Sequence, residues 1–262
     1  MIVGGCDIGS TTGKAVIMKE GIIVSYAIIP STTRPEVTAQ SAMDEAIRKA
    51  GLLKQEELKY IVGTGYGRLK VSFANENISE ITCHARGANW LCPSVRTVVD
   101  IGGQDCKVMS IDEKGKVIEF VMNDKCAAGT GRFFEAMARA LGCDLEGLSS
   151  LSLRAKRPST ITSQCSVFAE SEVVTLINEG IDLEDIAAGI HYSIAGRLNS
   201  MIRKVGLVED VALTGGCAKN EGLAKALEEK LGVKVKKLAI DPQIVGAIGA
   251  ALIARKRIDG QS

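Results

Sequence analysis

The sequence predicts an α/β protein built from two similar lobes, and three observations carry this prediction. Short apolar runs of strand length alternate with segments of helical periodicity. The run 2–8 ends in Asp7-Ile8-Gly9, and the run 95–101 ends in Asp100-Ile101-Gly102. Hydrophobic residues make up 46% of the 262 residues and charged residues 24%, as in an ordinary globular protein. The duplication predicts two βββαβα lobes whose Asp-Ile-Gly turns face each other across a cleft.

Each lobe is predicted to open with a meander of three strands. In the first half the runs are 2–8, 14–18 and 22–29, and Lys19-Glu20-Gly21 has the chemistry of a tight turn. In the second half the runs are 95–101, 106–111 and 117–122, with Asp112-Glu113-Lys114-Gly115 as the corresponding turn. The same strand pattern in both halves indicates an internal repeat.

Helical segments follow each meander. The segment 35–50 begins with a proline, which suits a first turn, and it stops before a glycine. The segment 182–204 is the longest, and its acidic start and basic end suit the helix dipole. The remaining predicted helices are 132–141, 166–178, 220–231 and 243–255, and the remaining strands are 210–214 and 233–236. The predicted lobes are therefore 1–94, joined by the C-terminal helix of about 243–262, and 95–242.

Charge and composition exclude several classes of partner. The net charge is +1, the pI is about 7.5 and aromatic residues are 4% of the chain, so neither nucleic acid nor an anionic membrane is expected as a partner. The N-terminus lacks a basic segment followed by an apolar one, and the apolar run 244–254 is too short to span a bilayer. We expect a soluble, cytoplasmic protein.

The first Asp-Ile-Gly turn continues into a segment suited to phosphate. Glycine allows backbone N–H groups to approach phosphate oxygens, and hydroxyl side chains add donors in 9–14. A P-loop is excluded for two reasons. Its spacing from the first glycine to the lysine is one residue longer than in this segment, and it needs a helix where a strand is predicted. A Rossmann turn is excluded because no helix follows. Asp7 and Asp100 are candidates to hold Mg²⁺ through water, and Asp105 is a third acidic candidate for positioning water; the sequence does not choose the base.

Two further glycine clusters complete this pattern. Thr214-Gly215-Gly216 follows a predicted strand and opens a helix, while the Gly/Ala-rich segment 242–250 is also explained by tight helix packing alone. The order of these motifs resembles the acetate/sugar kinase, Hsp70 and actin superfamily. That resemblance implies ATP or ADP held between two lobes, with closure coupled to hydrolysis.

Eight cysteines are scattered through the chain without a CxxC pair. Cys126 and Cys165 stand out because each precedes a predicted helix in a segment rich in small residues, where the helix dipole favours a thiolate. Thiolates are the usual ligands of iron–sulfur clusters, and an all-cysteine cubane needs four. A two-fold dimer with one cluster on its axis supplies four. Simple packing of both cysteines is an equally open interpretation of the chemistry.

The segments 123–133 and 165–172 resemble those of the 2-hydroxyacyl-CoA dehydratase activator ATPases, the BadF/BadG/BcrA/BcrD type that includes benzoyl-CoA reductase subunits. Thr64-Gly65-Tyr66-Gly67-Arg68, Cys83-His84-Ala85 and 188–191 agree with this resemblance. It implies an anaerobic homodimer with one bridging [4Fe-4S] cluster, whose ligands are Cys126 and Cys165. The implied nucleotide contacts are Ser10, Thr11, Thr12, Gly13, Lys14, Gly102, Gly103, Gln104, Gly215, Gly216, Lys219, Asn220 and Gln243.

The resemblance further implies that ATP drives one electron into an iron–sulfur dehydratase or reductase, with ferredoxin or flavodoxin as donor. The cysteines predicted to be buried thiols are Cys6, Cys83, Cys92, Cys106 and Cys143, while Cys217 is incidental to its glycine cluster. His84 and His191 are predicted to be structural. Three alternatives remain open: a small-metabolite kinase of the same fold, an ATP-binding regulator without electron transfer, and an activator of a double-cubane or aromatic-acyl-CoA reductase. The kinase gives no role to Cys126 and Cys165.

Overall fold

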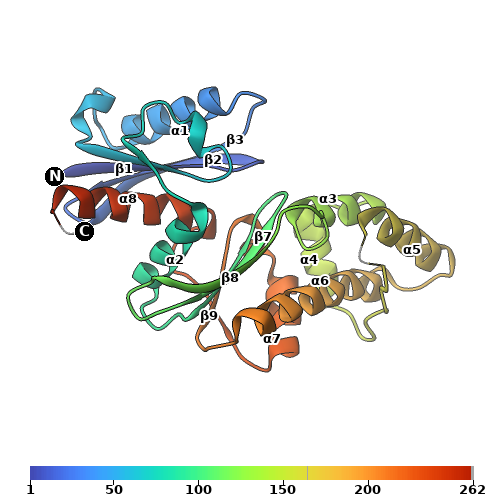
Figure 1. Cartoon of the computed structure of the whole chain (residues 1–262). Helices are drawn as coiled ribbons and strands as arrows, with labels where there is room; N and C mark the ends of the chain where they lie inside the picture. Colours follow the sequence, from blue (N-terminus) through green and yellow to red (C-terminus); the bar gives the residue numbers. More distant parts are fainter. Residues whose placement is uncertain (164, 261–262) are drawn as a thin grey trace. The chain divides into compact units, whose positions relative to one another are not determined.

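The computed structural model describes residues 1–163 and 165–260, which form two compact units (Figure 1). Unit 1 comprises 1–98, 111–118 and the C-terminal segment from 238, and unit 2 comprises 99–110 and 119–237. In the described part of the chain no helix is long and apolar enough to cross a membrane.

Unit 1 is a five-stranded mixed sheet covered on both faces by helices (Figure 1). The strand order is β3-β2-β1-β4-β5; β1 pairs antiparallel with β2 and parallel with β4. Helix α1 packs on β2 and β3, while α8 packs on β1 and β4 and crosses α2. The elements are β1 (Ile2–Ile8), β2 (Thr12–Lys19), β3 (Ile22–Pro30), α1 (Pro35–Lys49), β4 (Tyr60–Thr64), β5 (Glu76–Asn77), α2 (Glu80–Leu91) and α8 (Val245–Ile258).

Glycine residues, which have no side chain, allow α8 to lie close to its neighbours in unit 1. A Cβ added at Gly249 would lie 1.8 Å from the Cys83 carbonyl oxygen, and one added at Gly5 would lie 2.0 Å from the Ala247 carbonyl oxygen. Real Cβ atoms do not approach carbonyl oxygens so closely, so only glycine fits at these crossings. Tight helix packing, one of the two explanations given for the glycines of 242–250, therefore accounts for Gly249.

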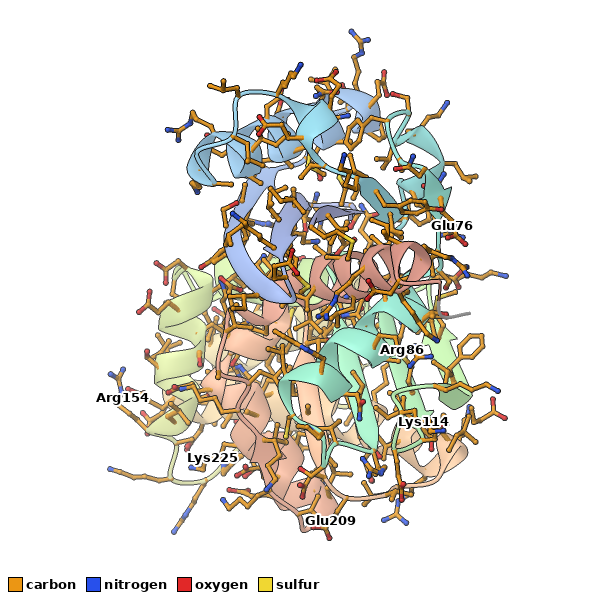
Figure 2. The ribbon with its side chains drawn as sticks, turned by 90° about the vertical axis from the view of Figure 1, so that its left-hand side faces the viewer. Glu76, Arg86, Lys114, Arg154, Glu209 and Lys225 are labelled. Atoms are coloured by element: carbon orange, nitrogen blue, oxygen red, sulfur yellow. The ribbon has the colours of Figure 1, made fainter. Side chains whose placement is uncertain are left out.

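Polar contacts hold the edges of unit 1 (Figure 2). Arg86 on α2 donates to the Lys114 carbonyl oxygen, in the turn after strand β7 (Cys106–Ile111), at 2.5 Å. Glu76 on β5 accepts two hydrogen bonds of 2.8 Å from Arg257 near the end of α8. Such paired bonds between guanidinium and carboxylate add geometric specificity and tie the C-terminal helix to the sheet edge.

Unit 2 carries a second sheet with the order β10-β9-β6-β7-β8, which repeats the order of the first sheet read from β5 to β3. Phe133, Phe134 and Met137 of α3 and Leu198 of α6 enter one core with strands β6 and β7. The elements are β6 (Thr97–Ile101), β7 (Cys106–Ile111), β8 (Val117–Asn123), α3 (Gly131–Ala140), α4 (Leu145–Leu153), α5 (Ser166–Asn178), α6 (Leu183–Val205), β9 (Val211–Thr214), α7 (Glu221–Leu231) and β10 (Val235–Lys236).

The predicted meanders, the repeat and the α/β class are confirmed. Thr12–Lys19 is a strand, which removes the P-loop on structural grounds as well. No element was predicted at β4, α2 or α4. One expectation was wrong: α3 begins at Gly131, so Cys126 lies in a loop five residues earlier rather than at a helix entry.

Candidate nucleotide and cysteine sites

Asp7 is buried at the end of β1, beside the turn that leads into β2. Its Oδ2 lies 3.5 Å from Lys14 Nζ and 4.0 Å from His84 Nε2. Gly65 (φ 89°) and Gly246 approach the same carboxylate so closely that an added Cβ would lie within 2.3 Å and 2.8 Å of its oxygens. A buried carboxylate is thus surrounded by backbone and by two basic side chains.

Asp100 occupies the equivalent place at the end of β6 in unit 2. Thr214 donates a hydrogen bond of 2.9 Å to its Oδ1, and Lys107 Nζ lies 3.5 Å from its Oδ2. Lys107 also contacts Asp105 at 2.8 Å and is itself buried. Of the three predicted acidic residues, the structure therefore joins Asp100 and Asp105 through one buried ammonium group.

The two sites match position by position. Lys14 and Lys107 each lie seven residues beyond the aspartate that they contact. Gly65 follows Thr64 at the end of β4, and Gly215 follows Thr214 at the end of β9; both have positive φ. An added Cβ at either glycine would meet the aspartate Oδ1 and the carbonyl oxygen of the next residue. Lys107 was not predicted as a site residue, although the Asp-to-Lys spacing of the repeat contained the signal for it. Thr214 and His84 were named in motifs, but their contacts with Asp100 and Asp7 were not predicted.

The turns themselves present backbone groups at the ends of the strands. In unit 1, Ser31 donates to the carbonyl oxygens of Gly9 (through Oγ, 2.9 Å) and Thr11 (through N, 2.9 Å). In unit 2, the first N–H groups of α3, from Gly131 and Arg132, donate to Gly102 and Gly103 at 2.9 Å. These carbonyl oxygens are thereby occupied by hydrogen bonds within the chain. The predicted nucleotide contacts in the turns with exposed or partly exposed side chains are Ser10, Thr11, Thr12, Lys14 and Gln104.

The third glycine cluster leads from β9 into α7. Gly216–Lys219 forms a short 3₁₀ turn, and the Asn220 side chain caps α7 by accepting from Leu223 N at 2.9 Å. His191 Nε2 lies 3.0 Å from the same Asn220 oxygen, and its Nδ1–H donates to the Ala187 carbonyl oxygen at 2.7 Å. Burial outweighs these bonds and lowers the pKa of His191. These contacts are those expected of a structural histidine. Gln243 lies in unit 1, where its backbone N–H donates a hydrogen bond of 3.0 Å to Asp241 Oδ1.

Side chains tie down both cysteine segments of unit 2. Asn123 donates to the carbonyl oxygens of Cys126 (2.8 Å) and Ala128 (3.1 Å), which fixes the loop between β8 and α3. Cys165 is the N-cap residue of α5 and is exposed, as the sequence predicted for a helix entry. Gln164, the residue before it, lies outside the described residues.

The buried cysteines differ chemically from these two. Burial raises the pKa of Cys83 and of Cys217 to about 12 and that of Cys106 to about 11, and it raises the pKa of the fully buried Cys6. These thiols stay protonated at neutral pH, so they are poor metal ligands and poor nucleophiles. The prediction of buried thiols is confirmed at Cys6, Cys83 and Cys106. It was wrong at Cys92 and Cys143, which are only partly buried, as is Cys217.

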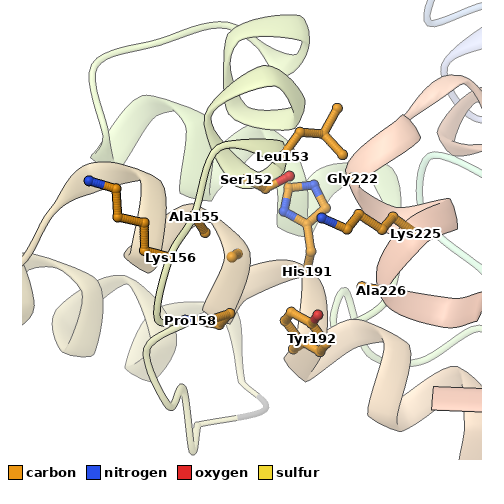
Figure 3. Close-up of a pocket in the computed structure, with 11 residues that line it drawn as sticks. Ser152, Leu153, Ala155, Lys156, Pro158, His191, Tyr192, Gly222, Lys225 and Ala226 are labelled. Atoms are coloured by element: carbon orange, nitrogen blue, oxygen red, sulfur yellow. The ribbon is translucent and has the colours of Figure 1, made fainter. Parts of the chain in front are cut away.

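A cavity of about 210 Å³ opens where α4, α6 and α7 meet (Figure 3). His191 and Tyr192 of α6, Gly222 and Lys225 of α7, and the segment that follows α4 line it. Gly222 is two residues beyond the capping Asn220. The cavity therefore adjoins both the third glycine cluster and the segment that leads to Cys165.

Duplicated sheets of this order, each with an aspartate at the end of its first strand and a glycine turn beside it, define the actin-like α/β fold class. Comparison with known proteins then identifies the family. The profile of the BadF/BadG/BcrA/BcrD ATPase family matches residues 5–254. The chain belongs to this family.

Several characterised relatives are similar over almost their whole length. A 2-hydroxyisocaproyl-CoA dehydratase activator of Clostridioides difficile is 43% identical over 97% of this chain and 95% of its own. The (R)-2-hydroxyglutaryl-CoA dehydratase activating ATPase of Acidaminococcus fermentans is 44% identical over 97% and 96%. A benzoyl-CoA reductase subunit of Thauera aromatica is 37% identical over 96% and 92%.

Solved structures agree with this assignment. Component A of the A. fermentans dehydratase superposes with a TM-score of 0.94 at 42% identity, covering 99% of both chains. The C. difficile activator, solved with bound ADPNP, gives 0.93 at 42% identity, covering 99% of this chain and 96% of the other. A glucokinase of Streptomyces griseus gives 0.60 at 13% identity over 98% and 100%, which shows a shared fold alone. The predicted actin/Hsp70/sugar-kinase-like fold is confirmed.

Proposed function

We propose that this ATPase is a one-electron activator: a homodimer that holds one [4Fe-4S] cluster between its subunits and, driven by ATP hydrolysis, reduces an iron–sulfur partner enzyme. The observation that carries the proposal is the exposed Cys165 at the start of α5. Val167 and Phe168 follow it and are each 68% exposed, so two large apolar side chains and a thiol are all exposed at the start of this helix. Such a surface favours a second protein surface over water.

The cysteine segments fit a cluster shared between chains. In the described residues, no group of three or more His, Cys, Asp or Glu side chains is placed to hold a metal ion. One chain contributes Cys126 and Cys165, and two chains contribute the four thiolates that a cubane needs. Ser166 Oγ, next to Cys165, is buried and has no hydrogen-bond partner among the described residues. When bound, the cluster would supply a reversible one-electron carrier of low potential.

The nucleotide would be held by the two Asp–Lys–Gly turns. Lys14 and Lys107 place positive charge beside Asp7 and Asp100, and the hydroxyls of 10–12 and the Gln104 amide add donors for phosphate oxygens. We propose that Asp7 and Asp100 hold Mg²⁺ through water and that Asp105, paired with Lys107, belongs to the same polar network. The remaining proposed contacts are Gly13, Gly102, Gly103, Gly215, Gly216, Lys219, Asn220 and Gln243.

ATP can change the reducing power of the cluster only if it binds one conformation of the protein more tightly than another. We propose that the lobes 1–94 with 243–262 and 95–242 close on ATP and thereby shift α5 and the loop of Cys126. Exposure of the sulfur ligands and hydrogen bonds to them set the potential of a cluster, so this movement would lower it. The electron would come from a ferredoxin or flavodoxin.

The names of the relatives support a class of acceptor. Two of them activate dehydratases that act on 2-hydroxyacyl-CoA, and a third is part of a benzoyl-CoA reductase. We propose a 2-hydroxyacyl-CoA dehydratase as acceptor because the dehydratase activators are the more similar. An aromatic-acyl-CoA or double-cubane reductase is the second candidate, which the similarity to the T. aromatica protein supports.

Anaerobic reconstitution tests the proposal. The wild-type protein should bind about four iron and four sulfide per dimer, and Cys126→Ser or Cys165→Ser should lose them while still binding ADP. Cys143→Ser, in the same unit, is the matched control and should keep the cluster. A metal-free wild-type protein, or an intact cluster in both ligand variants, would refute the proposal.

A further inference from the structure

Glu172 makes an unusual set of contacts with the chain ahead of Cys165. It lies on α5, seven residues beyond the cysteine, and its side chain turns back toward the start of the helix. Its Oε1 accepts from Thr162 N at 2.9 Å and from Thr162 Oγ1 at 3.0 Å, and its Oε2 accepts from Ser163 N at 2.9 Å. Both carboxylate oxygens are therefore used to hold two consecutive residues.

The segment 155–163, which we call the strap, is held at its other end as well. Asp185 in the first turn of α6 accepts from Lys156 N and Arg157 N, both at 2.8 Å. The strap then passes so close to α6 that a Cβ added at Gly189 would lie 2.3 Å from the Ser159 carbonyl oxygen. Ile161 is buried in the core of unit 2. The strap is thus a fixed segment that links the wall of the cavity in Figure 3 to the start of α5.

From this geometry we infer that Glu172 is a positioning residue for Cys165: by holding Thr162 and Ser163 against α5, it fixes the direction from which the chain reaches the cysteine. The inference rests on the proposed function, in which Cys165 ligates a cluster. Thiolate ligands depend on the outer groups that orient them, and removal of such a group costs about 10- to 100-fold in metal affinity.

The ionisation of Glu172 agrees with this role. Partial burial opposes the charged form, but the bonds from Thr162 and Ser163 outweigh it and lower the pKa of Glu172. The side chain is therefore a carboxylate at neutral pH, and each of its bonds is charge-assisted. Glu170 on the same helix is exposed and offers a matched control with the same change of charge.

The experiment compares Glu172→Gln with Glu170→Gln in the reconstituted full-length protein under anaerobic conditions. Glutamine keeps one acceptor oxygen but presents an NH₂ group to one of the two backbone N–H donors. We expect Glu172→Gln to release iron to a chelator about tenfold faster than wild type or more, and to give a broadened EPR spectrum of the reduced cluster. Glu170→Gln should match wild type in both, and ADP binding should be unchanged in all three proteins.

Hydrogen exchange separates failure of this inference from failure of the proposed function. In the cluster-free protein, Glu172→Gln should lose protection at the Thr162 and Ser163 amides, which tests the tether whether or not a cluster binds. If Glu172→Gln loses protection at these amides but releases iron and gives an EPR spectrum as wild type does, the positioning role alone is overturned. Unchanged protection at these amides in Glu172→Gln would also overturn it. A wild-type protein that binds no iron would overturn the proposed function, and this inference with it.

Discussion

Gly215 is the position at which the structure makes its most demanding prediction. The residue has φ 82° and ψ −179°, a region that only glycine occupies readily, and strain for another residue there is about 1–3 kcal/mol. An alanine Cβ would also lie 2.4 Å from the Ile101 carbonyl oxygen and 2.8 Å from Asp100 Oδ1, so the backbone after β6 must move. We therefore expect Gly215→Ala to destabilise the protein by about 3 kcal/mol, or roughly 6–12 °C in Tm.

Gly232 provides the control in the same unit. It too has positive φ (73°), in the left-handed helical region, but an added Cβ would meet nothing within 4 Å. Gly232→Ala should cost only the strain of that conformation, about 1 kcal/mol, or roughly 2–4 °C in Tm. Differential scanning calorimetry measures both variants, and isothermal titration measures ADP binding in both.

The functional consequence follows from Asp100. If the clash displaces this carboxylate, one charge-assisted interaction is lost, and ADP affinity should fall about tenfold or more in Gly215→Ala but stay unchanged in Gly232→Ala. Equal melting temperatures for the two variants would show that the close approach at Gly215 is absent in solution. A destabilised Gly215→Ala with wild-type ADP affinity would separate this turn from the nucleotide site.

Two further predictions concern titration and thiol reactivity. The pKa of His191 is lowered below its unfolded value of about 6.5. Its contribution to the free energy of unfolding is therefore present above that pH and is lost as the pH falls toward the folded pKa. Urea midpoints at pH 7.5 and 5.5 should differ more in wild type than in His191→Gln. A pH dependence that survives unchanged in His191→Gln would assign it to another group. In the cluster-free protein at pH 8, iodoacetamide should modify exposed Cys165 long before Cys6, Cys83, Cys106 or Cys217, whose thiols burial keeps protonated, and peptide mass mapping would show the order. Rapid labelling of Cys6 or Cys83 would contradict the burial described for them.

Local patterns were sufficient for much of the fold. The meander strands end within about two residues of the predicted positions because continuous apolar runs and the turn residues between them mark the strands directly. Elements with weaker patterns were harder to predict: α2 carries Cys83 and His84 on a buried face that only the crossing with α8 explains. Cys126 was placed at a helix entry because it precedes the predicted helix 132–141 in a segment rich in small residues, whereas Asn123 holds that stretch as a loop.

By itself, the sequence determined the repeat, the two Asp-Ile-Gly turns and the two cysteine segments, since each is a contiguous pattern of a few residues whose chemistry is local. Only the tertiary structure decided which side chains meet them. Sheet order and helix packing bring together the residues of three contacts: Lys107 with Asp100 and Asp105, Thr214 with Asp100, and Glu172 with the strap. Spacing along one segment describes a turn or a helix face, but a partner more than a few residues away depends on how the whole chain packs.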